Sequence, residues 1–101
     1  MIVKAWNNGA HHSTGAGYAI RIRRADRDAF FNPSWSTVIF DLPNGIRLQR
    51  RPSASFRDGC IEIRDKEIGK WLIGIGQARW PHKRPPGFSM IQIRGNHFQI
   101  I

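Results

Sequence analysis

The sequence predicts a single α+β domain spanning residues 1–101, with an antiparallel, curled or barrel-like sheet and one main helix closing an end. Three observations lead to this fold class. Short segments with alternating apolar and polar residues dominate the chain, turn sequences join four of them in pairs, and only one long segment has a helical period. No repeat or linker divides the 101 residues, of which 41% are hydrophobic.

The first third of the chain predicts two strands and a short helix. Ile2–Trp6 is a strand candidate, and Asn7–Gly17 is a loop rich in glycine and small polar residues. Tyr18–Arg24 alternates between apolar residues and arginines, which indicates a half-buried strand with a basic outer face. Asp26 is expected to cap a short helical turn that runs to Phe31.

Thr37–Leu42 and Ile46–Arg51 predict a hairpin whose register follows from its side chains. A two-residue turn would mix apolar and charged residues on one face. A three-residue loop, Pro43–Gly45, separates them and suits a type I turn followed by a left-handed glycine. The expected opposed pairs are Leu42/Ile46, Phe40/Leu48 and Asp41/Arg47.

The main helix is predicted after Asp65, which suits an N-cap, and before Gly76, which suits a terminator. Gly69 and Gly74 lower its intrinsic stability by about 1 kcal/mol each, so the helix depends on its packing face. That face is the apolar stripe Ile68, Trp71, Leu72 and Ile75.

The last predicted element is a hairpin around Gly95 and Asn96. A glycine in the first turn position suits a two-residue type II′ turn. With that turn, the inner face would hold the pairs Ile93/Phe98 and Ile91/Ile100.

Positive charge is the strongest functional signal. The net charge is +9, and residues 1–25 and 68–101 contain nine basic residues and no acidic one. Twelve of the sixteen basic residues are arginines, whose planar fork suits phosphate and guanine edges. We therefore expect a nucleic-acid partner, with DNA favoured over RNA; the alternative is that the charge only keeps the protein solvated.

Composition also limits the compartment. Cys60 is the only cysteine, so no internal disulfide can form. No apolar run approaches the roughly 20 residues of a membrane helix, and the N-terminal residues do not resemble a signal peptide. The expectation is a cytoplasmic protein without a membrane partner.

The basic, proline-rich segment Arg79–Gly87 is the best single candidate site. Its cations can contact phosphates while its tryptophan stacks on a base or sugar. The alternative is that the tryptophan packs on the core and the cations are solvated. The candidate residues are Arg79, Trp80, His82, Lys83 and Arg84.

Two further groups of arginines are candidates. Near the end of the first hairpin, Asp41 is expected to neutralise Arg47, which leaves three others to track a phosphate backbone or to protect a sheet edge. The second group is a row of arginines on the outer face of the strand that begins at Tyr18. We expect this row either to contact phosphates or to form ion pairs with Asp26 and Asp28. The residues of the two groups are Arg50, Arg51 and Arg57, and Arg21, Arg23 and Arg24.

Catalytic and metal chemistry have weaker support. His11 and His12 are adjacent, which does not place two ligands on one face, and Cys60 has no partner in a metal motif. We predict no metal and no cofactor. The enzymatic alternative is a metal-free ribonuclease that uses His82 or His97 as acid or base.

From Tyr18 to Ile101 the order of elements resembles the B3-type DNA-binding pseudobarrel of plant transcription factors and of some bacterial restriction enzymes. The matching segments are YAIRIRR, VIFDLPNGIRL, KEIGKWLIGIG and FSMIQIRGNHFQII. The loop 79–87 and residues 1–17 have no counterpart. The chain also resembles small proteins of bacterial mobile elements, which share no common activity.

The B3 resemblance implies two DNA-gripping arms. Arg23, Arg24 and Arg27 would fall in the first, and the arginines at 50, 51 and 57 near the second. The sequence thus favours a non-enzymatic nucleic-acid-binding module that contacts phosphates through arginine-rich strands and loops. Besides the ribonuclease, the alternative is an adaptor or homodimer with an acidic partner, anchored by Trp80 or Trp35.

Overall fold

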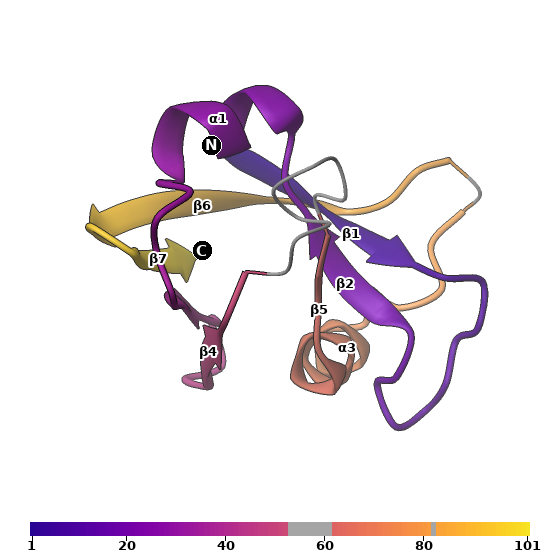
Figure 1. The fold of residues 1–101 in the computed structure, drawn as a ribbon. Coiled ribbons are helices and arrows are strands. Elements are labelled where there is room, and N and C mark those ends of the chain that lie inside the picture. The colour runs from indigo at the N-terminus through magenta and orange to yellow at the C-terminus, as the bar shows by residue number, and fades with distance from the viewer. Residues whose placement is uncertain (53–61, 82) are drawn as a thin grey trace.

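The computed structural model describes residues 1–52, 62–81 and 83–101, and Figure 1 shows its fold. The described residues form seven strands and two helices. In chain order these are β1 (Ile2–Asn7), β2 (Tyr18–Arg21), α1 (Arg24–Phe30), β3 (Val38–Asp41), β4 (Arg47–Arg50), β5 (Glu62–Arg64), α3 (Lys66–Gly74), β6 (Gly87–Arg94) and β7 (His97–Ile100).

The strands form one curled sheet in the order β4-β3-β7-β6-β1-β2-β5, so that β4 and β5 are its two edges. Figure 1 shows the sheet bending into a half-barrel, with α1 near one end and α3 beside β5. The predicted α+β class and curled sheet are confirmed. The sheet is mixed, however, because β3 pairs with β7 in parallel. Hairpins make sequence neighbours antiparallel, but β3 and β7 are far apart in the chain and no turn constrains their direction.

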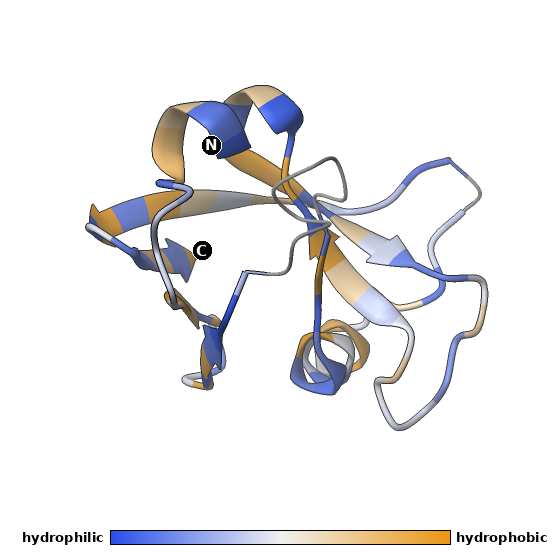
Figure 2. Cartoon of the chain, viewed as in Figure 1, coloured by the Kyte–Doolittle hydropathy of each residue, from blue (hydrophilic) through white to orange (hydrophobic). Residues whose placement is uncertain are grey.

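The core lies inside the curl and has an aromatic centre. Phe98 on β7 is fully buried and stacks on Phe31, which follows α1, with ring centroids 4.5 Å apart. Phe40 of β3 and Trp35 complete the cluster around Phe98. In Figure 2 orange and blue alternate towards the end of β6, where the apolar Ile91 and Ile93 are nevertheless exposed.

The first hairpin has the predicted register. Phe40 lies opposite Leu48 with both buried, and the Leu42 N–H donates to the Ile46 carbonyl at 2.8 Å. Gly45 has a φ of +88°, which the three-residue loop requires. Ile46 was expected on the inner face, but it is 38% exposed. It lies in the loop just before β4, which is an edge strand.

Helix α3 has both predicted ends. The Asp65 carboxylate accepts a hydrogen bond from the Glu67 N–H at 2.7 Å. After Gly74, the Gly76 N–H donates to the Ile73 carbonyl and the Gln77 N–H to the Leu72 carbonyl, a Schellman ending with Gly76 at φ +73°. The predicted stripe is buried except for Ile75, which is 47% exposed because it is the C-cap, beyond the last helical turn.

The closing hairpin has a different register from the predicted one. Arg94 pairs with His97, but a bulge between Gln92 and Arg94 shifts every later pair by one residue. Met90 therefore faces inward opposite Ile100, while the expected inner residues Ile91 and Ile93 are 43% and 45% exposed. One extra residue reverses the faces of a strand, and no local signal in the sequence marks it.

The second predicted strand and the first predicted cap also need correction. β2 ends at Arg21, although Ile22 remains buried as expected. Helix α1 begins at Arg24, with Arg23 in the N-cap position and no capping side chain. Asp26 lies within the first turn, where a negative charge suits the helix dipole, and is not the cap.

Candidate nucleic-acid interface

Ion pairs divide the cations of the described residues into two groups. Five cations have an acidic partner: Arg21 with Glu62, Arg27 with Asp28, Arg47 with Asp41, Arg50 with Asp65 and Lys70 with Glu67. The others form no ion pair within the described part of the chain. They are Lys4, Arg23, Arg24, Arg51, Arg64, Lys66, Arg79, Lys83, Arg84 and Arg94.

Strands β1, β2 and β5 bring several cations to one outer surface. In an antiparallel pair, directly opposed residues share a face. One row across the three strands holds Lys4, Arg21 and Glu62. The next row holds Trp6, Ala19 and Arg64. The intervening row, Ala5, Ile20 and Ile63, faces the core. We call the outer surface of Lys4, Trp6, Arg21 and Arg64 the Trp6 face.

The indole of Trp6 is the centre of this surface. The Arg64 Cζ atom lies 4.9 Å from the ring centroid, and the Arg21 Cζ atom lies 5.8 Å from it. Arg64 is two strands away from Trp6. It reaches the ring because the residue between them is Ala19, whose side chain is a single methyl group. The two guanidinium groups hold the indole in place through cation–π contacts.

Sequence reasoning did not identify Lys4, Trp6 or Arg64 as site residues. The alternating pattern of β1 could have identified two of them. Because Val3 and Ala5 are buried, Lys4 and Trp6 must both point to the outer face of the strand. Their association with Arg64 depends on pairing between distant strands.

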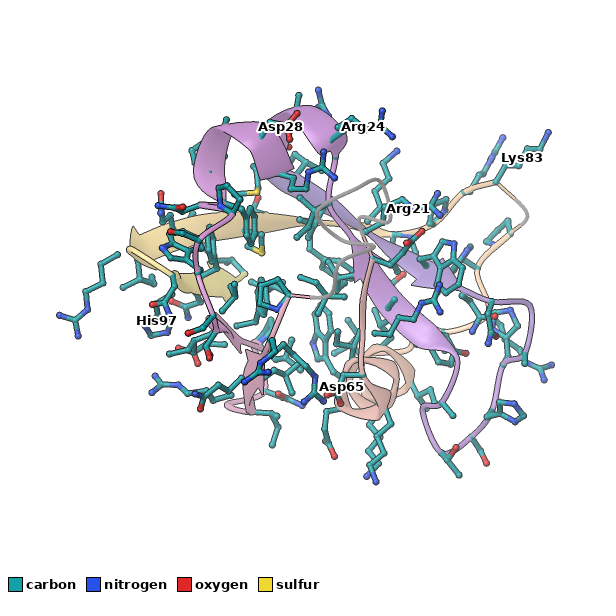
Figure 3. The ribbon with its side chains drawn as sticks, in the orientation of Figure 1. Arg21, Arg24, Asp28, Asp65, Lys83 and His97 are labelled. Atoms are coloured by element: carbon teal, nitrogen blue, oxygen red, sulfur yellow. The ribbon has the colours of Figure 1, made fainter. Side chains whose placement is uncertain are left out.

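The basic segments from the two ends of the chain meet beside the Trp6 face. Lys4 pairs with Gly87 of β6, and the Ala5 N–H donates to the Pro86 carbonyl at 2.9 Å. The predicted loop therefore enters the sheet at β1. Figure 3 shows Arg21, Arg24 and Lys83 on one side of the view, away from Asp65 and His97.

Within that loop, Trp80 packs on the body of the domain. Its half-buried ring lies 6.0 Å from that of Tyr18 and 5.9 Å from that of His11. Burial raises the pKa of the Tyr18 hydroxyl, and the Arg79 guanidinium opposes this shift. Arg79, Lys83 and Arg84 are exposed, whereas His82 lies outside the described residues. Trp80 thus anchors the loop that carries these cations.

The arginines predicted after β2 are only partly available. Arg21 pairs with Glu62, not with Asp26 or Asp28. Arg23 and Arg24 are exposed but stand at the start of α1, not on a strand row. Arg27 is bound to Asp28, and its side chain is only 12% exposed.

The arginines after the first hairpin are not a free group either. Arg50 forms an ion pair with Asp65, whose side chain is 4% exposed. Arg51 is exposed and forms no ion pair with a described residue. The predicted Arg57 lies outside the described residues.

Asp41 neutralises Arg47 as expected and also binds His97. Its carboxylate accepts from Arg47 Nε at 2.7 Å and lies 2.7 Å from His97 Nε2. These two contacts lower the pKa of the Asp41 carboxyl from 3.8 to about 2. Asp41 therefore stays ionised at neutral pH and holds both partners. One ring nitrogen of His97, a predicted acid or base, is occupied in this cluster.

The predicted histidine pair lies in the loop after β1. His11 Nδ1 is 2.9 Å from the Tyr18 hydroxyl, and His12 is exposed. Within residues 1–52, 62–81 and 83–101, no three His, Cys, Asp or Glu side chains are arranged to hold a metal ion. Neither helix of the same residues has the length and hydropathy to span a bilayer.

No protein-family model, curated protein or solved structure matches this chain.

Proposed function

We propose that this protein is a non-enzymatic nucleic-acid-binding module and that the Trp6 face is its main contact surface. The observation that carries the proposal is the contact between the half-buried Trp6 indole and the exposed Arg64 guanidinium, with the exposed Lys4 in the adjacent row. Cations on a sheet face contact phosphates without reading sequence, and an aromatic ring among them contacts a base or sugar. The single cysteine favours the cytoplasm as the compartment.

The exposed loop cations extend this surface. Lys83 and Arg84 are carried by the segment that joins β6 next to Lys4, so they lie on the same side as the Trp6 face in our proposal. The surplus charge of the two ends of the chain then acts as one positive field, which raises the association rate with a polyanion.

Replacing Arg64 with alanine is expected to weaken nucleic-acid binding about tenfold, the effect of losing one charge-assisted contact. The slope of log K against log salt should fall by about 0.7 to 0.9, the contribution of one neutralised phosphate. Fluorescence anisotropy of a labelled oligonucleotide at several salt concentrations measures both quantities.

Arg94→Ala is the matched control. Arg94 is also an exposed strand arginine without an ion pair to a described residue, but it lies at the β6–β7 turn. This variant should keep the wild-type slope. If the wild-type protein binds neither DNA nor RNA at low salt, or if the two variants lose affinity equally, the proposed surface is wrong.

A second candidate function, self-association, is favoured by an exposed apolar area on β6. Ile2 lies opposite Ser89, and the Ile101 N–H donates to the Ser89 carbonyl, so the two isoleucines flank one position of the strand. Ile2, Ile91 and Ile101 are all exposed. A two-fold axis through such an area would bury it against itself.

Light scattering at several protein concentrations tests this candidate. A homodimer through this area predicts twice the chain mass for the wild type and the chain mass for Ile91→Glu. A wild-type protein that is monomeric at every concentration removes the candidate.

A further inference from the structure

The Trp6 face belongs to extended strands and not to a protruding element. Its residues occupy two rows across β1, β2 and β5, separated by about 6.8 Å along the strands. Recognition of duplex bases usually requires a helix or a β-ribbon that enters the major groove. A sheet surface with an aromatic side chain is instead suited to bases that lie flat upon it.

The described helices are poorly placed to read a duplex. Helix α1 has only seven residues, and its acidic residues Asp26 and Asp28 offset its two arginines, with Asp28 bound to Arg27. Helix α3 buries one side in the core, and its first turn is bound through Asp65 to Arg50. The exposed Arg23 and Arg24 stand at the start of the short helix α1, so the described residues offer no long basic helix that could enter a groove near the Trp6 face.

The indole and its two arginines offer a flat surface for a base. A base can stack on the half-buried indole or on the exposed guanidinium plane of Arg64, since both are flat groups. In a duplex each base is covered by its neighbours, so only an unpaired base can make this contact. Glu62 binds Arg21 through both Nε and Nη2, whereas Arg64 forms no ion pair with any residue that the structure describes.

We infer that the ligand of the Trp6 face is single-stranded nucleic acid, held by stacking on Trp6 and by phosphate contacts to Lys4 and Arg64. This inference rests on the proposed function and specifies its substrate class. Stacking makes the binding tolerant of base sequence, because every base presents a flat face.

The test compares three labelled probes of equal length by fluorescence anisotropy: oligothymidylate, its abasic sugar–phosphate analogue, and a duplex. The wild-type protein should bind oligothymidylate at least about fivefold more tightly than the abasic analogue, the effect of one stacked base. It should also prefer oligothymidylate to the duplex. Both comparisons use the unaltered protein, so they do not depend on the folding of any variant.

Two variants then locate the stacking. Trp6→Leu should remove the preference for oligothymidylate over the abasic analogue, and Trp6→Phe should retain part of it. Phe30→Leu removes an exposed aromatic ring on α1, outside the Trp6 face, and should leave the preference unchanged. Thermal unfolding of each variant confirms that it is folded.

The outcomes separate this inference from the proposed function. Duplex binding equal to or tighter than oligothymidylate binding overturns the inference but leaves nucleic-acid binding intact. A preference that survives Trp6→Leu in a folded protein overturns the stacking role of Trp6. Failure to bind any of the three probes and an RNA strand of the same length overturns the proposed function itself.

Discussion

Replacing Gly69 with alanine is expected to lower the free energy of unfolding by about 3 kcal/mol, although alanine is the better helix former. Gly69 is buried where α3 crosses the loop that follows β1. A Cβ at this position would lie 2.1 Å from the Gly15 carbonyl oxygen and 2.5 Å from its Cα atom. These are backbone atoms, so the loop or the helix would have to move. Urea unfolding followed by circular dichroism measures the change.

Gly74→Ala is the control in the same helix. Apart from the adjacent residues and the helix's own backbone, no atom of the described residues lies within 4 Å of a Cβ built at Gly74, and its φ is not in the left-handed region. This variant should gain about 0.5 to 1 kcal/mol from helix propensity and from the less flexible unfolded chain. The changes in unfolding free energy of the two variants should have opposite signs. A stabilising Gly69→Ala would contradict the close approach of Gly69 to Gly15.

The two helix glycines, Gly69 and Gly74, show which features of the fold the local sequence pattern can predict. The caps of α3 follow from Asp65 and Gly76, which act within one turn of their own positions. Both helix glycines look equally unfavourable in the sequence. Only the fold shows that Gly69 meets Gly15, a residue from a distant loop, while Gly74 meets nothing.

The same limit applies to the candidate site. The first hairpin register was predictable because the charges of Asp41 and Arg47 and the apolar pair Phe40 and Leu48 select one loop length. The β6–β7 bulge inverted the second register without any comparable signal. The Trp6 face was missed because Arg64 reaches Trp6 across an intervening strand.

Charge counting was also insufficient. The excess of basic residues at the two ends is real, but each arginine's availability depends on its partner in space. Arg50 was expected to be free because Asp41 neutralises Arg47. The structure pairs it with Asp65, fifteen positions further along the chain.

Replacing Arg50 with alanine is expected to cost about 2 kcal/mol of unfolding free energy, the second large effect. Arg50 ends β4, and Asp65 follows β5, so this ion pair joins the two edges of the half-barrel. Without Arg50, the Asp65 carboxylate would remain buried with one oxygen still bound to the Glu67 N–H and its charge uncompensated. This expected loss of unfolding free energy is smaller than the usual cost of breaking a buried ion pair, because the Arg50 side chain is 49% exposed.

Arg51→Ala is the control for this prediction. Arg51 is the next residue, is exposed and has no ion pair with a described residue, so its loss should change stability by less than about 0.5 kcal/mol. Combining Arg50→Ala with Asp65→Asn should recover part of the loss, because the amide keeps the cap but carries no charge. If the double variant is as unstable as the sum of the two single variants, the ion pair does not join the edges. Because Arg50 is engaged in this way, any effect of Arg50→Ala on nucleic-acid binding should follow the fraction of folded protein, whereas Arg64→Ala should weaken binding in a fully folded domain.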